Sequence, residues 1–409
     1  MLDIDFIRKN LETVKRNNSA CGVVVDLHAL VALDDERRGL IREIEDLRAM
    51  RNKKSKTKPT APEIEKMRLV GDKIAEKEES LRNVESSWRR LMLELPNIKD
   101  KSVPVGLDEA SNEVLRSWGA KPTFTFKPRP YFELAAVTPF IDTEKAAKVS
   151  GSRFFYLRGP LVRLERALIQ FAFDELTQGG FEPILPPLMV KEEAMLGTGH
   201  FPASRNEIYA VNPGEDNLYL IGTGEVPLLS YHAGEALMAE ELPKKYVTVT
   251  PCFRREAGSY GKDTSGILRV HQFYKVEMFV FCAPDQSVKL HEELLAAEEA
   301  IYQALGLHYQ VVANSTGDSG RGAVKQYDIE AWFPSQNKYR ELTSTSNTTD
   351  FQTRRVGIKI AGGELAHSLN GTGISDRAML AVLEQFQNSD GGVTIPNVLR
   401  RYTGFSEIV

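Results

Sequence analysis

Apolar residues in the first quarter of the chain recur at steps of three, four and seven, the period of a helix with one apolar stripe. The first stripe contains Leu33, Leu40, Ile44 and Leu47, and the second contains Met67, Val70, Ile74, Leu81, Val84, Trp88, Leu91 and Leu95. Pro59 and Pro62 lie between the stripes and mark a turn. Because each stripe can be buried only against the other, the pattern predicts two long antiparallel helices that form a rod projecting from the body.

The pattern changes near Pro96, where a helical rhythm gives way to alternating helix and strand signals. The later elements that it predicts are a buried helix at 159–176, strands at 245–252 and 270–282, and a helix at 285–305. These strands outnumber the crossover helices that an all-parallel sheet needs. We therefore predict an α+β fold, with a helical coiled-coil arm in residues 1–104 and an antiparallel sheet with flanking helices in residues 105–409.

The composition excludes several classes of protein but does not indicate a function. The 52 Lys and Arg residues nearly balance the 56 Asp and Glu residues, and 42% of the chain is hydrophobic, which excludes collagen-like and wholly disordered classes. No run approaches the roughly 20 apolar residues that span a bilayer, and the first residues do not resemble a signal peptide. Three distant cysteines without a Cys-x-x-Cys spacing predict no zinc site, no disulfide framework and a cytoplasmic location without a membrane partner.

The tip of the predicted rod is strongly basic. Between residues 48 and 58 the chain carries Arg48, Arg51, Lys53, Lys54, Lys56 and Lys58 and no acid. One interpretation is a solvated helix end, where the helix dipole also favours cations. We favour the other, a contact with a nucleic-acid backbone, because cationic side chains release the counterions condensed on phosphates.

Residues 251–278, PCFRREAGSYGKDTSGILRVHQFYKVEM, form the most informative segment. Two strand-like runs flank a polar loop, so the segment predicts a long hairpin. Alternation places Arg254 and Glu256 on one face, and Phe273 and Glu277 share a face of the return strand. A stacking surface next to charged groups favours a small-molecule site over an exposed ion pair, which would stabilise the protein by only about 0 to 1 kcal/mol.

Two further segments accompany this hairpin. Residues 180–190, GFEPILPPLMV, are typical of an edge strand, although a plain strand and turn explains them equally well. Residues 369–387, LNGTGISDRAMLAVLEQFQ, predict a glycine-rich strand followed by a helix that Ser375 or Asp376 could cap. Arg377 then lies in the first turn, where the helix dipole disfavours a cation, so we expect either a bound polyphosphate or a neighbouring acid to compensate it.

Together the three segments resemble the signatures of class II aminoacyl-tRNA synthetases. With the arm and the runs LIGTGEVPL and YRELTSTSNTTDFQTRR, the whole chain is similar to the bacterial-type seryl-tRNA synthetase family. The resemblance implies a class II catalytic sheet, activation of L-serine with ATP and Mg²⁺ to seryl-adenylate, and transfer to tRNA(Ser). It also implies a homodimer formed through the first signature strand, an arm that grips the tRNA, and serylation of tRNA(Sec), since many members perform it.

The resemblance also implies site residues. Arg254 matches the arginine on the α-phosphate and Arg377 a second catalytic arginine, and Glu341 and Ser344 match Mg²⁺ ligands, whose hard oxygens suit that ion. The implied ATP-binding set is Arg254, Arg255, Glu256, Val270, Phe273, Glu341, Leu342, Thr343, Ser344 and Arg377. The implied serine-binding set is Thr223, Gly224, Glu225, Arg254, Glu277, Asn370 and Thr372. The implied tRNA-binding set is the six cations of the basic tip.

The chain departs from the family pattern at two places that bear on the site. Gly224 replaces the usual Ser or Ala, which predicts a more flexible loop. The third signature is one residue shorter than usual between Asn370 and Arg377, so the local backbone must absorb a deletion or the serine pocket is altered.

Two alternative functions remain open at this level. A relative that loads an amino acid onto a carrier protein would lack the long arm, and the basic arm therefore argues against it. A non-catalytic, tRNA-binding paralogue would fit the shortened third signature. The retention of Arg254, Glu256, Glu341, Ser344 and Arg377 argues against that alternative.

Overall fold

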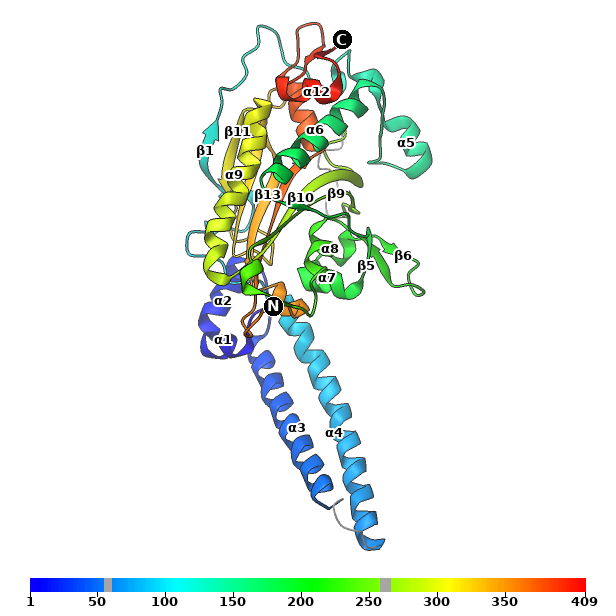
Figure 1. The fold of residues 1–409 in the computed structure, drawn as a ribbon, viewed down its shortest axis with the longest axis vertical. Coiled ribbons are helices and arrows are strands. Elements are labelled where there is room, and N and C mark those ends of the chain that lie inside the picture. Colours follow the sequence, from blue (N-terminus) through cyan, green and yellow to red (C-terminus); the bar gives the residue numbers. More distant parts are fainter. Residues whose placement is uncertain (55–60, 258–265) are drawn as a thin grey trace. The chain divides into compact units, whose positions relative to one another are not determined.

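The computed structural model describes the backbone of residues 1–54, 61–257 and 266–409, and the side chains of these residues except 53, 54 and 61. The chain separates into two compact units, Met1–Pro96 and Asn97–Val409, which we call the N-terminal and C-terminal units. The described residues of the first form helices and no strand, and the second combines helices with a large sheet (Figure 1). In the described residues, no helix is sufficiently long and apolar to cross a lipid bilayer.

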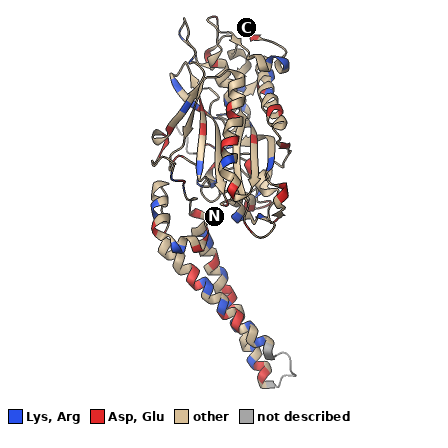
Figure 2. Cartoon of the chain, turned by 60° about the vertical axis from the view of Figure 1, so that its left-hand side comes forward, with Lys and Arg blue, Asp and Glu red and all other residues tan. Residues whose placement is uncertain are grey.

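The N-terminal unit confirms the prediction of two long helices. Short helices α1 (Ile4–Lys9) and α2 (Leu11–Ala20) precede α3 (Leu27–Lys54) and α4 (Ala61–Glu94), which pack side by side. The buried seam between them contains Leu40, Ile44, Val70, Ile74 and Val84. Outside this seam both helices carry acidic and basic side chains interspersed along their length (Figure 2), as expected for a helix whose polar faces meet solvent.

A buried carboxylate ties the start of α3 to α1. Asp34 is fully buried, and its oxygens pair with Arg8 at 3.1 Å, Arg37 at 3.0 Å and Arg38 at 2.7 Å. A buried charge is tolerated only when it is paired and hydrogen-bonded, and three guanidinium groups satisfy that condition. The apolar pattern gave no signal for this cluster.

Within the described residues of the C-terminal unit, eight strands form one sheet in the order β1-β11-β12-β13-β15-β10-β9-β4. Neighbouring strands run antiparallel, except that β4 pairs in parallel with β9, so the predicted antiparallel sheet is confirmed with one parallel edge. The strands are β1 (Glu113–Trp118), β4 (Glu182–Pro183), β9 (Lys244–Phe253), β10 (Gln272–Cys282), β11 (Tyr309–Ala313), β12 (Lys325–Phe333), β13 (Lys338–Thr349) and β15 (His367–Ser375).

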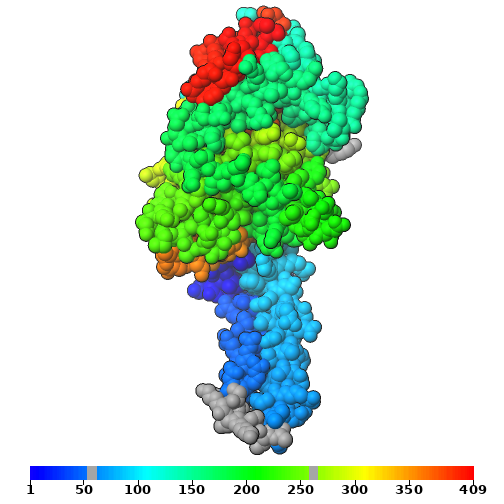
Figure 3. Space-filling model, turned by 45° about the vertical axis from the view of Figure 1, so that its right-hand side comes forward, coloured from blue at the N-terminus to red at the C-terminus, as the bar shows by residue number. Residues whose placement is uncertain are grey.

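Helices α6 (Pro160–Gln178), α9 (Ser287–Leu305) and α11 (Arg377–Gln385) pack on the sheet and enclose the main core. The short C-terminal helix α12 (Arg400–Thr403) packs against α6, and Figure 3 shows the last residues (red) against this part of the unit. Smaller elements include α5 (Thr143–Ser150), α7 (Glu192–Thr198), α8 (Glu225–Ser230), α10 (Thr353–Val356), β5 (Met189–Lys191), β6 (Ala210–Val211) and β7 (Leu218–Leu220).

Alternation along β13 separates the two faces of the sheet. The Thr343 hydroxyl donates to Glu298 of α9 at 2.9 Å, so its side chain faces the helical layer although the residue also borders a cavity that Ser344 and Ser346 line. Because successive side chains of a strand point to opposite faces, the helical layer and the cavity lie on opposite sides of the sheet. The helices therefore form a rigid support behind the candidate site.

Candidate functional site

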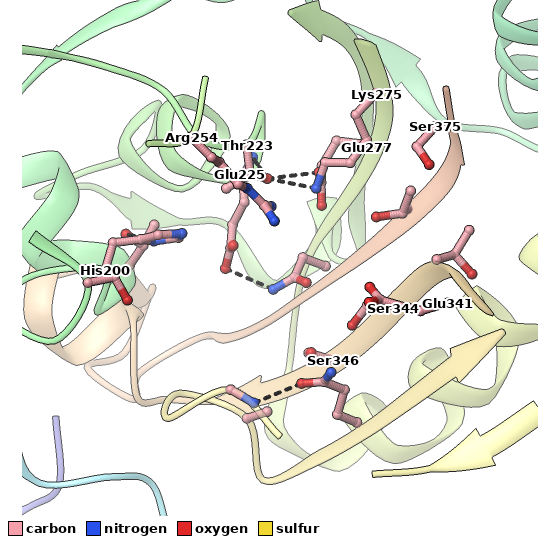
Figure 4. Close-up of a pocket in the computed structure, with 18 of the residues that line it drawn as sticks. His200, Thr223, Glu225, Arg254, Lys275, Glu277, Glu341, Ser344, Ser346 and Ser375 are labelled. Atoms are coloured by element: carbon pink, nitrogen blue, oxygen red, sulfur yellow. Dashed lines mark hydrogen bonds and ion pairs between the residues drawn. The ribbon is translucent and has the colours of Figure 1, made fainter. Parts of the chain in front are cut away.

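A cavity of about 520 Å³ brings together the separated segments of the C-terminal unit (Figure 4). Its wall comes from α8, from the loop after β9, and from β10, β13 and β15. The predicted residues that line it are Thr223, Glu225, Arg254, Glu256, Val270, Phe273, Glu277, Glu341, Leu342, Thr343, Ser344, Asn370, Thr372 and Arg377. Two predicted residues, Gly224 and Arg255, are not part of this lining.

Gly224 has a role other than the predicted flexibility. Its φ of −63° is open to every residue type, so no conformational freedom is needed there. A Cβ at this position would lie 2.7 Å from the Thr248 Cγ2 atom and 3.3 Å from the Glu277 Cβ atom. Space, rather than backbone freedom, therefore requires glycine here, and the more flexible loop stays a prediction.

The Arg254 guanidinium is held in place before any substrate arrives. Its Nε atom donates to the Gly222 carbonyl at 3.1 Å, and its Cζ atom lies 5.2 Å from the centroid of the Phe273 ring. Its backbone N–H donates to the His271 carbonyl at 2.9 Å, which joins the two arms of the predicted hairpin. A fixed cation facing the cavity can stabilise negative charge without reorganising first.

Glu256 reaches the cavity by a different path from the predicted alternation. Strand β9 ends at Phe253, and Glu256 has a φ of +51°, so the expectation that it continues the strand face of Arg254 is wrong. The Arg269 Nη1 atom donates to its carboxylate at 2.7 Å. This ion pair fixes the carboxylate on the cavity wall.

Thr223, Lys275 and Glu277 form a buried polar cluster at one side of the cavity (Figure 4). The Thr223 hydroxyl donates to Glu277 Oε2 at 2.9 Å, and Lys275 Nζ donates to the Thr223 oxygen at 2.9 Å while pairing with the same Glu277 oxygen. Burial raises the pKa of the Glu277 carboxyl, and the Lys275 ammonium opposes this. The cluster offers carboxylate oxygens to a small amine.

Glu225 is a second carboxylate that lines the cavity, and it is half-buried. Its Oε1 atom accepts from Gln352 Nε2 at 2.6 Å and from Asn370 Nδ2 at 2.8 Å. Burial raises the pKa of Glu225, and the Gln352 amide opposes the shift. Thr372 lies opposite Glu277 in the β10–β15 register, where a bulge between Val276 and Glu277 makes room for one extra residue of β15.

Arg377 and Glu341 form the opposite wall. Arg377 Nη1 lies 3.1 Å from the Glu341 carboxylate and donates to the Glu341 carbonyl at 3.0 Å. Burial acts to raise the pKa of Glu341, but the guanidinium groups of Arg377, Arg254 and Arg269 together outweigh it, and the pKa is below its ordinary value. Asp376 stands at the N-cap of α11 without capping it, because its carboxylate accepts from the Tyr274 N–H at 3.0 Å instead.

The oxygens around Glu341 fit a divalent cation such as Mg²⁺. Burial is the main cause that raises the pKa of Asp328 to about 8, and the nearby Glu341 charge adds to it. Glu341 and Ser344 line the cavity, and Ser344 pairs with Asp328 in the register of β12 and β13. Carboxylate and hydroxyl oxygens are the ligands that Mg²⁺ accepts, usually together with substrate phosphates.

The basic tip is described only in part. Arg48 pairs with Glu78 of α4 at 2.7 Å, and Arg51 is exposed. The side chains of Lys53 and Lys54, and all of Lys56 and Lys58, lie outside the described residues. Whether the tip contacts nucleic acid stays a prediction.

The sequence patterns did not predict several side chains that line the cavity, among them Lys275, Gln352 and His200. Lys275 stands two residues before Glu277, so strand alternation would have placed both on one face. Gln352 and His200 follow no local pattern and reach the cavity only through tertiary packing. Burial lowers the pKa of His200 to about 4, so its ring is neutral near pH 7.

The chain matches two protein-family profiles. Residues 1–99 match the seryl-tRNA synthetase N-terminal domain, and residues 209–386 match the class II tRNA synthetase core domain (G, H, P, S and T). A serine–tRNA ligase from Thermodesulfovibrio yellowstonii is 42% identical over 425 residues, covering 100% of both chains. One from Geobacter sulfurreducens is 42% identical over 418 residues, covering 99% of each.

Two solved structures have the same fold over the whole chain. The seryl-tRNA synthetase from Pyrococcus horikoshii complexed with ATP superposes with a TM-score of 0.91 at 40% identity, covering 100% of this chain and 99% of that one. The cytoplasmic serine–tRNA ligase from Naegleria fowleri in complex with AMP gives a TM-score of 0.87 at 32% identity, covering 100% and 98%.

Proposed function

The chain belongs to the seryl-tRNA synthetase family and is a serine–tRNA ligase, and we propose that it makes seryl-adenylate in the cavity around Arg254. In this reaction a serine carboxylate oxygen attacks the α-phosphorus of ATP, and the bond to the β-phosphate breaks with release of pyrophosphate. A ribose hydroxyl of the terminal tRNA adenosine then attacks the seryl carbonyl, and AMP leaves. The observation that carries the proposal is that one cavity holds the buried carboxylate of Glu277, the half-buried carboxylate of Glu225 and a fixed guanidinium.

Arg254 is positioned to act on the transferred group. Negative charge grows on the α-phosphate during attack, and a guanidinium already fixed by the Gly222 carbonyl meets that charge without a reorganisation cost. Phe273 and Arg377 line the cavity and provide a stacking surface and a cation for the adenine ring. Glu256, held by Arg269, would accept from the adenine amino group.

Glu341 and Ser344 would hold Mg²⁺, which supplies charge neutralisation to the phosphates of ATP. Arg377 holds the Glu341 carboxylate on the cavity wall through a contact of 3.1 Å. The arginine therefore orients this oxygen ligand in addition to compensating the charge of the nucleotide. This double role accounts for a cation in the first turn of α11, where the helix dipole disfavours one.

Serine fits the polar composition of the other end of the cavity. Its ammonium needs hydrogen-bond acceptors, which Glu225 and Glu277 provide. Its hydroxyl needs a polar partner, and Thr372 and Asn370 line the same cavity. A site built to bond a hydroxyl rejects alanine, because its own polar groups would then be unpaired. We propose that these residues select serine.

The proposed partners of the N-terminal unit are tRNA(Ser) and tRNA(Sec). Helices α3 and α4 offer a long paired surface, and the described tip includes Arg48 and Arg51. Replacing residues 48–78 with a short Gly-Ser linker should spare adenylate formation and abolish tRNA charging. Loss of adenylate formation would contradict the proposal that the N-terminal unit binds tRNA and the C-terminal unit forms the adenylate.

We further propose a homodimer that forms through the first signature segment and works in the cytoplasm. β4 is an edge strand of only two residues, and Leu185 just beyond it is 89% exposed. An unpaired edge beside an exposed apolar residue is a surface that a second copy can cover. A reducing compartment suits the three cysteines, which are not joined in a disulfide.

The central experiment is serine-dependent exchange of pyrophosphate into ATP, followed by charging of tRNA(Ser) and tRNA(Sec). Exchange with serine, but not with alanine, threonine or glycine, supports the proposed pocket. Binding of tRNA without exchange would favour the non-catalytic paralogue. Exchange followed by loading of a carrier protein, with no tRNA charging, would favour the other alternative.

A further inference from the structure

Lys275 is a buried cation inside the cavity for which the proposed reaction scheme has no role. It is 8% exposed, and its neighbours Thr223 and Glu277 are 3% and 1% exposed. Lys275 and Glu277 are two residues apart on β10, so both side chains lie on the cavity face of the strand. Figure 4 shows the contacts that join these three side chains.

Hydrogen-bond counting fixes the direction of the Thr223 hydroxyl. A hydroxyl donates once and accepts through two lone pairs. Lys275 Nζ at 2.9 Å and the Glu225 N–H at 3.2 Å are both donors to the Thr223 oxygen, and they occupy both lone pairs. The hydroxyl proton must then point to Glu277 Oε2, which lies 2.9 Å away.

The same cluster leaves two oxygens for a ligand. Lys275 and Thr223 both engage Glu277 Oε2, and Gln352 and Asn370 both engage Glu225 Oε1. Within the described residues, Glu277 Oε1 and Glu225 Oε2 take part in no such hydrogen bond or ion pair. Two carboxylate oxygens from different elements thus remain for one ammonium group.

Glu277 depends on Lys275 for its charge. The other ionisable groups whose charge couples to it are Glu225 from α8, Cys252 from β9 and, across the sheet, Glu298 from α9. Burial and the Glu225 charge both raise the pKa of Glu277, and Lys275 on the same strand is the principal opposing cation. Removing one member of a buried ion pair leaves the other charge uncompensated, and the group then tends to become neutral.

We infer that Lys275 is a positioning residue for the amino acid substrate, which keeps Glu277 an ionised acceptor and turns the Thr223 hydroxyl toward it. The Lys275 ammonium occupies Oε2 of Glu277 and leaves Oε1 to the substrate ammonium. The inference rests on the proposed function and adds a residue that determines serine affinity without handling ATP.

The test compares the serine KM and the ATP KM in pyrophosphate exchange between about pH 6.5 and 8.5 for the full chain, K275M and K275R. For K275M we expect a serine KM about tenfold higher or more near pH 7, the order expected for losing a charged hydrogen bond. The ATP KM should stay within about twofold. The defect should shrink as the pH rises, because Glu277 regains its charge, and K275R should be less impaired than K275M.

The matched control is K245M, which removes a lysine of the same sheet that pairs with Glu293 at 3.1 Å outside the cavity. It should leave both KM values unchanged. If K275M does not fold, K275Q takes its place, since it keeps a donor of similar length and lacks the charge. An unchanged serine KM would overturn the inference. A rise in both KM values that does not vary with pH would also overturn it. Absence of serine-dependent exchange in the unmodified chain would instead overturn the proposed function.

Discussion

Asn370 and Glu225 lie 145 positions apart in the chain, and the Asn370 Nδ2 atom donates to Glu225 Oε1 at 2.8 Å. The Gln352 amide donates to the same oxygen at 2.6 Å. A carboxylate oxygen that receives two amide donors is held in one orientation, so the other oxygen of Glu225 is presented to the cavity in a fixed direction. Asn370 therefore belongs to the site despite the shortened third signature, through a contact with Glu225.

Replacing Asn370 with Ala should weaken serine binding, because Glu225 loses one of the two donors that orient it. We expect a serine KM raised by about tenfold in pyrophosphate exchange, the order of one hydrogen bond to a charged group, with an unchanged ATP KM. The control is N388A, which removes an amide that donates to Glu407 at 2.6 Å outside the cavity. Equal effects of both variants on the serine KM would contradict the orienting role.

Replacing Arg254 with Ala should slow adenylate formation by roughly 10²-fold or more, the size expected for losing one preorganised charge contact in the transition state. Pre-steady-state formation of seryl-adenylate measures this directly. The neighbouring R255A is the comparison, since Arg255 does not line the cavity. An equal loss of rate in R255A would show that residues outside the cavity lining also contribute to adenylate formation. A near-normal rate in R254A would show that Arg254 does not stabilise the transition state.

Replacing Gly224 with Ala should impair serine binding by steric pressure. The new Cβ would stand 2.7 Å from the Thr248 Cγ2 atom, closer than two carbon atoms can pack. We expect a higher serine KM and a lower melting temperature, since overpacking commonly costs about 1 to 3 kcal/mol. In the double variant G224A/T248A the obstructing methyl is gone, and recovery of both quantities is expected. No recovery would mean that the glycine is needed for another reason.

Elements with a strong local period were predictable from the sequence. The apolar spacings of three and four that include Ile44 and Ile74 predicted two helices. Both residues lie in the buried seam between these helices. The alternation that puts Glu277 on the cavity face of β10 is equally local. These patterns survive folding because burial of one face stabilises the same conformation that the local sequence favours.

Features set by contacts between distant segments were not predictable. Glu256 leaves the strand geometry at a φ of +51°, a conformation that its residue type does not announce. Gly224 is required by a methyl group of Thr248 on another element. Gln352 enters the cavity from a segment that has no periodic signal. The motifs therefore predicted the kind of site. The residues that orient the motif side chains were set by tertiary packing and were not predicted.

His291 predicts how acid destabilises the C-terminal unit. Its Nε2 atom lies 3.2 Å from the Thr345 carbonyl, and its ring stacks on Tyr327 at 4.9 Å between centroids. Burial lowers the pKa of His291 from 6.5 to about 4. Between those values the unfolded chain binds a proton that the folded chain does not, so the free energy of unfolding falls as the pH falls from about 6.5 toward 4.

The variant H291Q lacks this proton-binding difference, whereas every other titrating group is shared with the unmodified chain. The gap in melting temperature between the unmodified chain and H291Q should therefore be largest near pH 7 and shrink toward about pH 4.5. Calorimetry at a series of pH values measures the gap. H28Q replaces an exposed histidine of α3 and is the matched control for a histidine-to-glutamine change away from the core. A gap for H291Q that stays constant would mean that His291 takes up its proton equally well in the folded chain.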